Sequence, residues 1–445
     1  YSLINKPNWD LKQETFAYLD NDLDCLMEVI NKFSKYIFKT YDIQLTDCIT
    51  VARLSLNILH KKYLQNKSKL PLITKPSIFF FIKQAYYGGI SEVYKPYVEN
   101  AFYYDVNSEY PYVAKNKMPG TEYTYIESLD GSSLNLDELF GYFYCEVKTN
   151  NSYLGLLPNH INGSLILPHG NFNGVWFSEH LKFVRDCGYE IKPIKGYNFN
   201  VVDNVFNDFV DDLYKIRLNT SGSVKAITKL LLNSPFGRLG MNINKYKSSL
   251  VDKNNLDYII SIHDDVDFKQ ITENKFLVTH DSEISREKCH HLGLDYVKVL
   301  NKANIDEENS TNIQDVSITT AAAITSYAQI YITKIKLWVL ENGGEIFYSD
   351  TDSLVTSIPL PDELMGFDLG KFKLEYKIKR AFFITSKTYY IETDEGEEII
   401  KSKGVLSKSL TVKDFEDMYY HSKNSVGQKK FSTKDYSSGT VNIKT

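Results

Sequence analysis

The chain has 445 residues, of which 43% are hydrophobic and 24% are charged, and its formal net charge at pH 7 is -5. This length and balance are typical of a globular protein with a sizeable core, so a mainly disordered chain is excluded. An uncharged apolar run such as Ile78–Ile82 is far shorter than the roughly 20 residues that a membrane-spanning helix needs, so we expect no membrane partner.

Five cysteines are present, an odd number, and no two form a CxxC pair. A disulfide framework is therefore not expected, and a reducing compartment is the default. The first residue is Tyr1 rather than Met, and residues 1–13 lack the basic start and apolar stretch of a secretory signal. We expect a fragment or a processed product, whose localisation cannot be read from this end.

The pattern predicts a mixture of helices and strands. Apolar residues recur at helical spacing across residues 10–64, and a turn-rich linker follows at Asn66–Pro76. Phe102–Val106 has the composition of a short strand. The later predicted elements are a small β-containing insertion at 141–168, a helical hairpin at 202–218 and 223–240, a polar insertion at 241–312, an apolar helix at 318–340 and two short strands at 345–358.

The two short strands of residues 345–358 meet at an acidic turn. Asp350 and Asp352 lie together at this turn, and Asp105 is the candidate for a third carboxylate. Such a set can hold two divalent metal ions roughly 3.5 to 4 Å apart for an in-line displacement at phosphorus. The sequence therefore predicts a metal-dependent site for phosphoryl or nucleotidyl transfer.

The helix predicted from Ser223 carries a basic face. Lys225, Lys229 and Asn233 recur every four residues, while Ile227, Leu230, Leu231 and Ser234 are expected to pack inward. With Arg217 across the turn, this face could clamp a triphosphate. Taken alone, the same pattern also fits a solvated lysine stripe.

Residues 371–387 form a second basic segment, which could lie along a nucleic-acid backbone. Glu375 is the single acid among its basic residues, Lys371, Lys373, Lys377, Lys379, Arg380 and Lys387.

In order along the chain, these segments resemble motifs of family B DNA polymerases. Residues 105–111 (DVNSEYP) are similar to DxxSLYP, 229–237 (KLLLNSPFG) to KxxxNSxYG, and 348–353 (YSDTDS) to YxDTDS. Residues 86–89 (YYGG) and 387–389 (KTY) resemble YxGG and KxY. Insertions on both sides of the helical hairpin and a short segment after Gly404 are similar to the protein-primed branch of phages and linear plasmids.

The resemblance implies an α+β right-hand polymerase fold with an antiparallel-sheet palm, helical-hairpin fingers, a small thumb and two insertions. The implied parts are an exonuclease remnant at 1–66, linker and first palm segment at 67–122, a first insertion resembling a terminal-protein-binding region at 123–204, fingers at 205–239, a second insertion at 240–314, second palm segment at 315–403 and thumb at 404–445.

The resemblance also implies a DNA-directed DNA polymerase with two Mg²⁺ ions, for which Mn²⁺ could substitute. Its metal ligands would be Asp105, Asp350, Asp352 and the carbonyl of Val106, and the three aspartates would be the catalytic residues. Nucleotide contacts are expected from Tyr110 (as a steric gate against ribose), Arg217, Lys225, Lys229, Asn233 and Phe236. Primer or DNA contacts are expected from Tyr86, Gly88, Gly89, Lys371, Lys387 and Tyr389. For Tyr110 and Tyr389 a core aromatic is the alternative.

The implied partners are template-primer DNA, deoxynucleoside triphosphates and a terminal protein. Abundant Asn, Lys, Ile and Tyr suggest AT-rich coding. Together with the resemblance to linear-plasmid polymerases, this implies a mitochondrial linear plasmid or a mitochondrial insertion of one, with a cytoplasmic plasmid or virus as the alternative.

Three positions depart from the family pattern. Glu109 replaces the usual apolar residue before Tyr110, which would be costly if its side chain were buried unpaired. Phe236 stands where Tyr is commoner, and Pro235 is expected to kink the end of its helix. These departures are expected to tune nucleotide affinity.

Tyr18 and Asp22 resemble the YxxxD exonuclease motif, four residues apart on one helix face. The partner motifs would lie upstream, so we expect no proofreading by this chain.

Two alternatives to an active DNA polymerase remain. One is a catalytically silent remnant that binds DNA or terminal protein, and the other is a reverse transcriptase. The Asp-Thr-Asp-Ser turn at Asp350–Ser353 differs from the paired Asp-Asp that reverse transcriptases favour.

Overall fold

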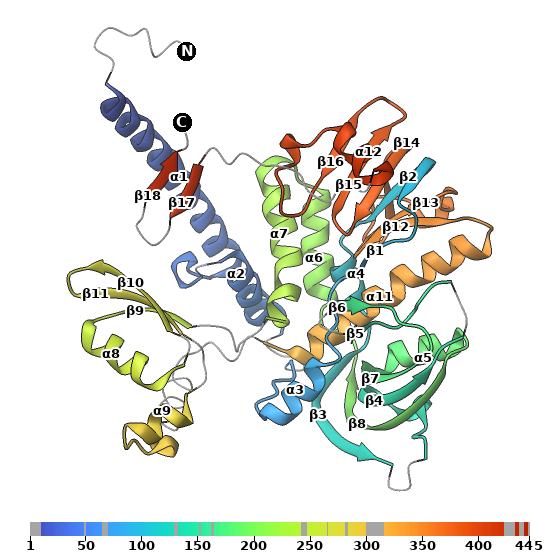
Figure 1. The fold of residues 1–445 in the computed structure, drawn as a ribbon, viewed down its shortest axis with the longest axis horizontal. Coiled ribbons are helices and arrows are strands. Elements are labelled where there is room, and N and C mark those ends of the chain that lie inside the picture. The colour runs from blue at the N-terminus through green and yellow to red at the C-terminus, as the bar shows by residue number, and fades with distance from the viewer. Residues whose placement is uncertain are drawn as a thin grey trace. The chain divides into compact units, whose positions relative to one another are not determined.

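The computed structural model describes residues 10–48, 50–64, 70–128, 132–150, 153–161, 164–241, 247–264, 266–280, 284–299, 316–421, 432–435 and 440–443. The chain divides into two compact units, the first comprising residues 1–69 with 204–238 and the second residues 70–203 with 239–445 (Figure 1). Helices combine with antiparallel sheets, which confirms the predicted α+β class.

The first unit is helical. Its elements are α1 (Leu11–Tyr41), the 3-10 turn η1 (Leu45–Asp47), α2 (Val51–Ile58), the π-helical turn η2 (Leu59–Tyr63), α6 (Asn207–Leu218) and α7 (Gly222–Leu239). Asp10 caps the start of α1 by accepting a hydrogen bond from the backbone N–H of Gln13. Tyr63 packs edge to face on Phe209 and donates its hydroxyl to Asp212, 3.1 Å away, which joins η2 to α6.

The predicted helical hairpin is present as α6 and α7, but its inward face differs from the prediction. Leu230, which we expected to be buried, is 54% exposed. Leu231 is buried as predicted, and its carbonyl accepts a hydrogen bond from the Ser55 hydroxyl of α2. The other buried residues of α7 include Thr228, Leu232 and Phe236, which the prediction did not place inside. Pro235 lies inside α7, which continues to Leu239.

The second unit is built on a seven-stranded antiparallel sheet in the order β1-β12-β13-β2-β14-β15-β16 (Figure 1). Its strands are β1 (Ser91–Val93), β2 (Tyr97–Val106), β12 (Ile346–Asp350), β13 (Ser353–Thr356), β14 (Phe372–Thr385), β15 (Thr388–Thr393) and β16 (Glu398–Lys401). Around the sheet are α3 (Pro76–Lys83), α4 (Glu109–Val113), α11 (Ile318–Glu341), α12 (Val412–Tyr420) and the 3-10 turns η5 (Asp362–Leu364) and η6 (Ser407–Ser409).

Apolar side chains hold α11 and α12 to this sheet. Ile332, Ile335 and Val339 of α11 form one buried cluster with sheet residues that include Val106 and Leu354. Phe415 of α12 forms another with Phe382 and Tyr390. The middle strands are therefore fixed by packing as well as by their hydrogen bonds.

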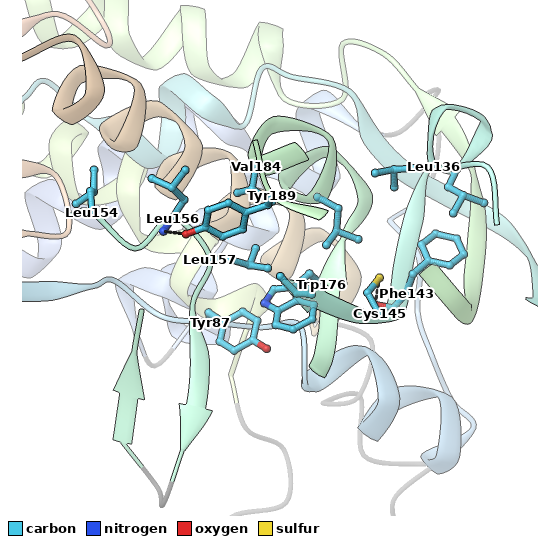
Figure 2. Close-up of a cluster of buried hydrophobic side chains, with 13 residues drawn as sticks. Tyr87, Leu136, Phe143, Cys145, Leu154, Leu156, Leu157, Trp176, Val184 and Tyr189 are labelled. Atoms are coloured by element: carbon cyan, nitrogen blue, oxygen red, sulfur yellow. Dashed lines mark hydrogen bonds between the residues drawn. The ribbon is translucent and has the colours of Figure 1, made fainter. Parts of the chain in front are cut away.

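A second sheet, in the order β3-β8-β4-β7, lies mostly within the residues predicted as the first insertion. It consists of β3 (Met118–Glu127), β4 (Gly141–Lys148), β7 (Asn171–Phe177) and β8 (Glu190–Val202), with η3 (Leu136–Glu138), α5 (Ser178–Asp186) and the hairpin of β5 (Asn159–Ile161) and β6 (Ser164–Ile166). Figure 2 shows its core, where Trp176 and Tyr87 lie close together and Tyr189 accepts a hydrogen bond from the backbone of Leu156 at 3.1 Å.

The second predicted insertion contains a three-stranded sheet in the order β10-β11-β9. Its elements are β9 (Lys247–Val251), α8 (Lys253–Ile262), β10 (Val266–Thr272), β11 (Lys275–His280) and α9 (Arg286–His291). The C-terminal segment includes the hairpin of β17 (Ser432–Asp435) and β18 (Thr440–Ile443). The boundaries assigned from the sequence to palm, fingers, insertions and thumb stay predictions.

All five cysteines are unpaired. Within the described ranges, no helix combines the length and apolar character required to cross a bilayer.

Candidate active site

Asp105 and Asp352 are brought together by the pairing of β2 with β13. Asp105 lies opposite Ser353 in the register of these strands, and the backbone N–H of Val106 donates to the carbonyl oxygen of Asp352 at 2.9 Å. On the other side of β2, Asp105 lies opposite Lys373 of β14. Because strand register is fixed by the buried faces, the sheet sets the backbone positions of both aspartates.

Asp350 ends β12 and forms an ion pair with Lys387. The ammonium of Lys387 lies 2.6 and 2.8 Å from the two carboxylate oxygens of Asp350. The backbone N–H of Lys387, which has a left-handed φ of 61°, donates to the Tyr348 hydroxyl at 3.1 Å. Tyr348 in turn stacks on Phe383, with ring centroids 4.8 Å apart. These contacts hold Lys387, which is distant in sequence, against the acidic turn.

The segment of residues 86–90 packs against the acidic turn. The N–H of Thr351, which has a left-handed φ of 57°, donates to the carbonyl of Ile90 at 2.8 Å. A Cβ at Gly89 would collide with the Thr351 side chain, whereas one at Gly88 would meet nothing within 4 Å. Tyr86 is half-buried, and a Cβ at Gly240 would meet its hydroxyl. Gly89 therefore has a structural role in seating the turn, in addition to the predicted DNA contact.

Glu109 and Tyr110 begin α4, directly after Ser108 with its left-handed φ of 54°. Glu109 is 1% exposed, and neither carboxylate oxygen has a hydrogen-bond partner. Burial raises the pKa of Glu109 well above its usual value, with a further contribution from the charges of Asp352 and Asp105. Burial and the carboxylate of Glu109 likewise raise the pKa of the half-buried Tyr110. The burial of Glu109 without a partner, which we described from the sequence as costly, is therefore present in the structure.

Tyr389 lies in the core of the sheet. It is 9% exposed, packs against Tyr348 and Phe383, and lies 3.5 Å from the hydroxyl of Tyr103. Tyr103 in turn lies 3.2 Å from the hydroxyl of Ser353. The structure thus gives Tyr389 the core role that was the alternative from sequence, and its primer contact stays a prediction.

The basic segment of residues 371–387 is less positive than its own sequence indicates. Glu392 on β15 pairs with both Lys379 and Arg380, at 2.6 and 2.5 Å. Lys373 pairs with Glu375 at 2.9 Å, and Lys371 donates to the carbonyl of Glu363. The sequence of this segment alone does not show that an acidic residue on the neighbouring strand offsets part of its positive charge.

The predicted phosphate-binding residues belong to the first unit. Lys225 and Lys229 are exposed on α7, and Arg217 lies 5.7 Å from the ring centroid of Tyr214. Asn233 donates its side-chain amide to the carbonyl of Lys229 at 3.0 Å. Phe236 is 5% exposed and packs edge to face on Phe206, so this ring serves a core.

Tyr18 and Asp22 both lie exposed on α1, in agreement with their predicted spacing on one helix face.

The donor set of the acidic turn suits a hard divalent cation, since Mg²⁺ prefers carboxylate and carbonyl oxygens. In the part of the chain that the structure describes, no three His, Cys, Asp or Glu side chains are grouped as metal ligands. The strands bring the backbones of Asp105, Asp350 and Asp352 together, while Lys387 neutralises the carboxylate of Asp350.

Sequence reasoning missed two polar residues of α11 near Glu109. Lys336 is 3% exposed, and burial lowers its pKa to about 8, opposed by the charges of Glu92 and Glu109. Gln329 is 6% exposed, and its side-chain oxygen has no partner. A glutamine and a lysine seven positions apart, on one face of a largely apolar helix, were the signal that could have identified them.

Comparison with known proteins identifies relatives over the whole chain. A protein of Podospora anserina named "Probable DNA polymerase" is 46% identical over 452 residues, which cover 100% of this chain and 37% of that protein. One of the same name from Agaricus bitorquis is 29% identical, covering 92% of this chain and 52% of that protein. The chain thus spans about a third to a half of the length of these curated relatives.

The fold is similar to that of solved Phi29 DNA polymerase structures. The complex with primer-template DNA has a TM-score of 0.65 at 18% identity, covering 92% of this chain and 68% of that one. The ternary complex with incoming nucleotides has a TM-score of 0.64 at 17% identity, covering 92% and 69%. The family model described as "DNA polymerase type B, organellar and viral" matches residues 2–332. This chain therefore belongs to the organellar and viral type B DNA polymerase family.

Proposed function

We propose that the chain is a DNA-directed DNA polymerase that adds deoxynucleotides to a primer 3′-hydroxyl. The observation that carries the proposal is the pairing of β2 with β13, which places Asp105 beside the Asp350–Ser353 turn. Family membership supports the same activity. The named Phi29 complexes contain primer-template DNA and incoming nucleotides, which supports DNA and nucleotides as the partners of this chain.

In this proposal, Asp105 and Asp352, assisted by Asp350 and the carbonyl of Val106, would hold two Mg²⁺ ions. When bound, such ions lower the pKa of the attacking hydroxyl and neutralise the phosphates and the leaving pyrophosphate. The chain's own contribution is to place the ligands, because the sheet register sets the backbone positions of Asp105 and Asp352. Lys387 pairs with the carboxylate of Asp350. A protein nucleophile is not required.

The remaining residues would bind and select the substrates. Tyr110 would exclude a 2′-hydroxyl, Asn233 and Phe236 would pack beside the nascent base pair, and the cations of Arg217, Lys225 and Lys229 would bind the nucleotide phosphates. Primer and template contacts, which position without reading sequence, would come from Tyr86, Gly88, Gly89, Lys371, Lys387 and Tyr389.

The way in which replication starts and the DNA element that is copied are also part of the proposed function. We propose that the full protein can start from a hydroxyl on a terminal protein and copies a mitochondrial linear DNA element, or a cytoplasmic plasmid or virus. The two insertions on either side of the helical hairpin and the AT-rich coding inferred from composition support this assignment.

Template-directed primer extension tests the function. Purified chain would be given one labelled DNA primer annealed to either a DNA or an RNA template of the same sequence, with Mg²⁺ and each nucleotide singly. We expect incorporation of only the complementary deoxynucleotide and a strong preference for the DNA template. A preference for RNA would favour the reverse transcriptase, and binding of DNA without any incorporation would favour the silent remnant.

A further inference from the structure

A small polar cavity lies beside Glu109 and Tyr110. Its volume is about 20 Å³, and Gln329, Thr333 and Lys336 of α11 line it together with these two α4 residues. A cavity of this size holds one water molecule if two to four polar groups surround it. Within the second unit, α4 and α11 are also joined by Tyr112 and Tyr331, whose rings meet 5.1 Å apart.

Three buried side-chain oxygen atoms at the cavity have no hydrogen-bond donor. Both carboxylate oxygens of Glu109 and the side-chain oxygen of Gln329 are buried without a partner. The amide nitrogen of Gln329 is already used, since it donates to the carbonyls of Gly88 and Tyr87 at 2.9 and 3.3 Å. Leaving such acceptors buried and unsatisfied destabilises the fold. A water molecule has two protons to donate and can serve Glu109 and Gln329 at once.

Lys336 sets the electrostatics of the cavity. Its ammonium donates to the Tyr94 hydroxyl at 3.1 Å, and Tyr94 donates to Glu92 at 2.6 Å. The ammonium retains further protons, and Lys336 lines the same cavity as Glu109. A metal cation there would be repelled by Lys336, whereas water can accept from the ammonium and donate to an oxygen of Glu109. The chemistry of the lining therefore favours water.

We propose that Glu109, Gln329 and Lys336 bind one internal water molecule, and that this network positions Tyr110 and so contributes to the discrimination between deoxyribo- and ribonucleotides. The second half of this proposal rests on the proposed polymerase function. The physical link is short, because Tyr110 follows Glu109 in α4 and lines the cavity itself. Without the network, α4 keeps the contact between the rings of Tyr112 and Tyr331. It loses the polar contacts at its first residues, where Tyr110 lies.

A high-resolution crystal structure of the wild-type chain tests the water site without any need for activity. We expect one ordered water within hydrogen-bond distance of the Glu109 carboxylate and the Gln329 oxygen. The double variant Glu109→Leu/Lys336→Met should lack it. An empty cavity in the wild type overturns the water site.

Single-nucleotide incorporation tests the positioning role. The double variant replaces both buried ionisable side chains with apolar ones of similar size, so neither is left buried without the other, and we expect it to fold and to incorporate deoxynucleotides. The ratio of kcat/KM for a deoxynucleotide to that for the matching ribonucleotide should fall about tenfold relative to the wild type. Glu109→Gln, which is nearly isosteric, should lower this ratio by less. It provides the test if the double variant does not fold.

Two further variants make the result decisive. Ser326→Ala changes a buried polar residue of α11 that does not line the cavity and should leave the ratio unchanged. Tyr110→Ala sets the value for complete loss of the gate. Folded, active variants with the wild-type ratio overturn the positioning role. A wild-type chain without any incorporation contradicts the proposed function instead and leaves the crystallographic test of the water site in force.

Discussion

The backbone N–H of Val106 donates a hydrogen bond to the carbonyl oxygen of Asp352, 2.9 Å away. This bond joins the two segments that carry Asp105 and Asp352, although they are more than 200 positions apart in the sequence. A hydrogen bond between strand backbones does not depend on the side chains of either aspartate. Substitution of these carboxylates should therefore leave the sheet intact, which separates effects on activity from effects on folding.

Gly89 should be intolerant of a side chain because of Thr351. A Cβ at Gly89 collides with the Thr351 side chain, so Gly89→Ala should lower the free energy of unfolding by about 1–3 kcal/mol. Gly88→Ala, where a Cβ meets nothing within 4 Å, is the matched control and should cost less. Thr351→Gly removes the colliding side chain, so the double variant should recover the stability that Gly89→Ala loses. A double-mutant cycle, with stability measured by denaturant unfolding, checks this. Equal losses at Gly88 and Gly89 would contradict this role.

Lys387 should compete with divalent metal for Asp350. Because its ammonium contacts both oxygens of that carboxylate, at 2.6 and 2.8 Å, Lys387→Met should lower the Mg²⁺ concentration that gives half-maximal primer extension. We expect a shift of roughly threefold or more, as for a charge interaction at a partly exposed site. Lys408→Met, at an exposed position of η6, should leave the midpoint unchanged. A midpoint that rises in Lys387→Met would show that Lys387 assists metal binding.

The stability gained by Glu109→Gln should depend on pH. The pKa of Glu109 is raised from its usual 4.5 by burial and by Asp352 and Asp105, with Lys336 opposing. Below that usual value the carboxyl is protonated in both the folded and the unfolded chain. As pH rises, the unfolded chain releases this proton first, so the wild type loses stability relative to Glu109→Gln. The difference in unfolding free energy should therefore grow as pH rises from about 4.5 toward neutral.

Denaturant unfolding of both proteins across that pH range measures the effect. Glu395→Gln, in an exposed turn, is the control and should show a flat difference. A Glu109→Gln difference that shrinks with rising pH would mean that the ionised carboxylate is the form stabilised by folding.

Local patterns in the sequence predicted the acidic hairpin well. The strands expected at residues 345–358 are β12 and β13, and the apolar helix expected at 318–340 is α11. Strand β2 begins five residues earlier than the predicted Phe102, because residues 97–101 pair with residues of β14 that are distant in sequence. Such pairing depends on tertiary structure and is invisible to a local pattern.

Burial explains most of what the sequence did not reveal. Leu230 was expected inside and is exposed, while the neutralisation of Lys379 and Arg380 depends on Glu392 across the sheet. Glu109 was recognised as a departure from the family pattern, but Lys336, which lines the same cavity, was not, since only folding places α4 against α11. Periodicity identifies the elements, and it does not identify which polar residues they enclose together.

The most direct test of the central claim is primer extension by Asp352→Ala beside Asp394→Ala. Asp352 lies in the candidate site, whereas Asp394 lies in an exposed turn after β15 of the same sheet. We expect the wild type and Asp394→Ala to extend a DNA primer with Mg²⁺, and Asp352→Ala to be slower by roughly 1000-fold, since metal ions supply several kcal/mol of charge stabilisation. No extension by the wild type, or undiminished extension by folded Asp352→Ala, would contradict the account.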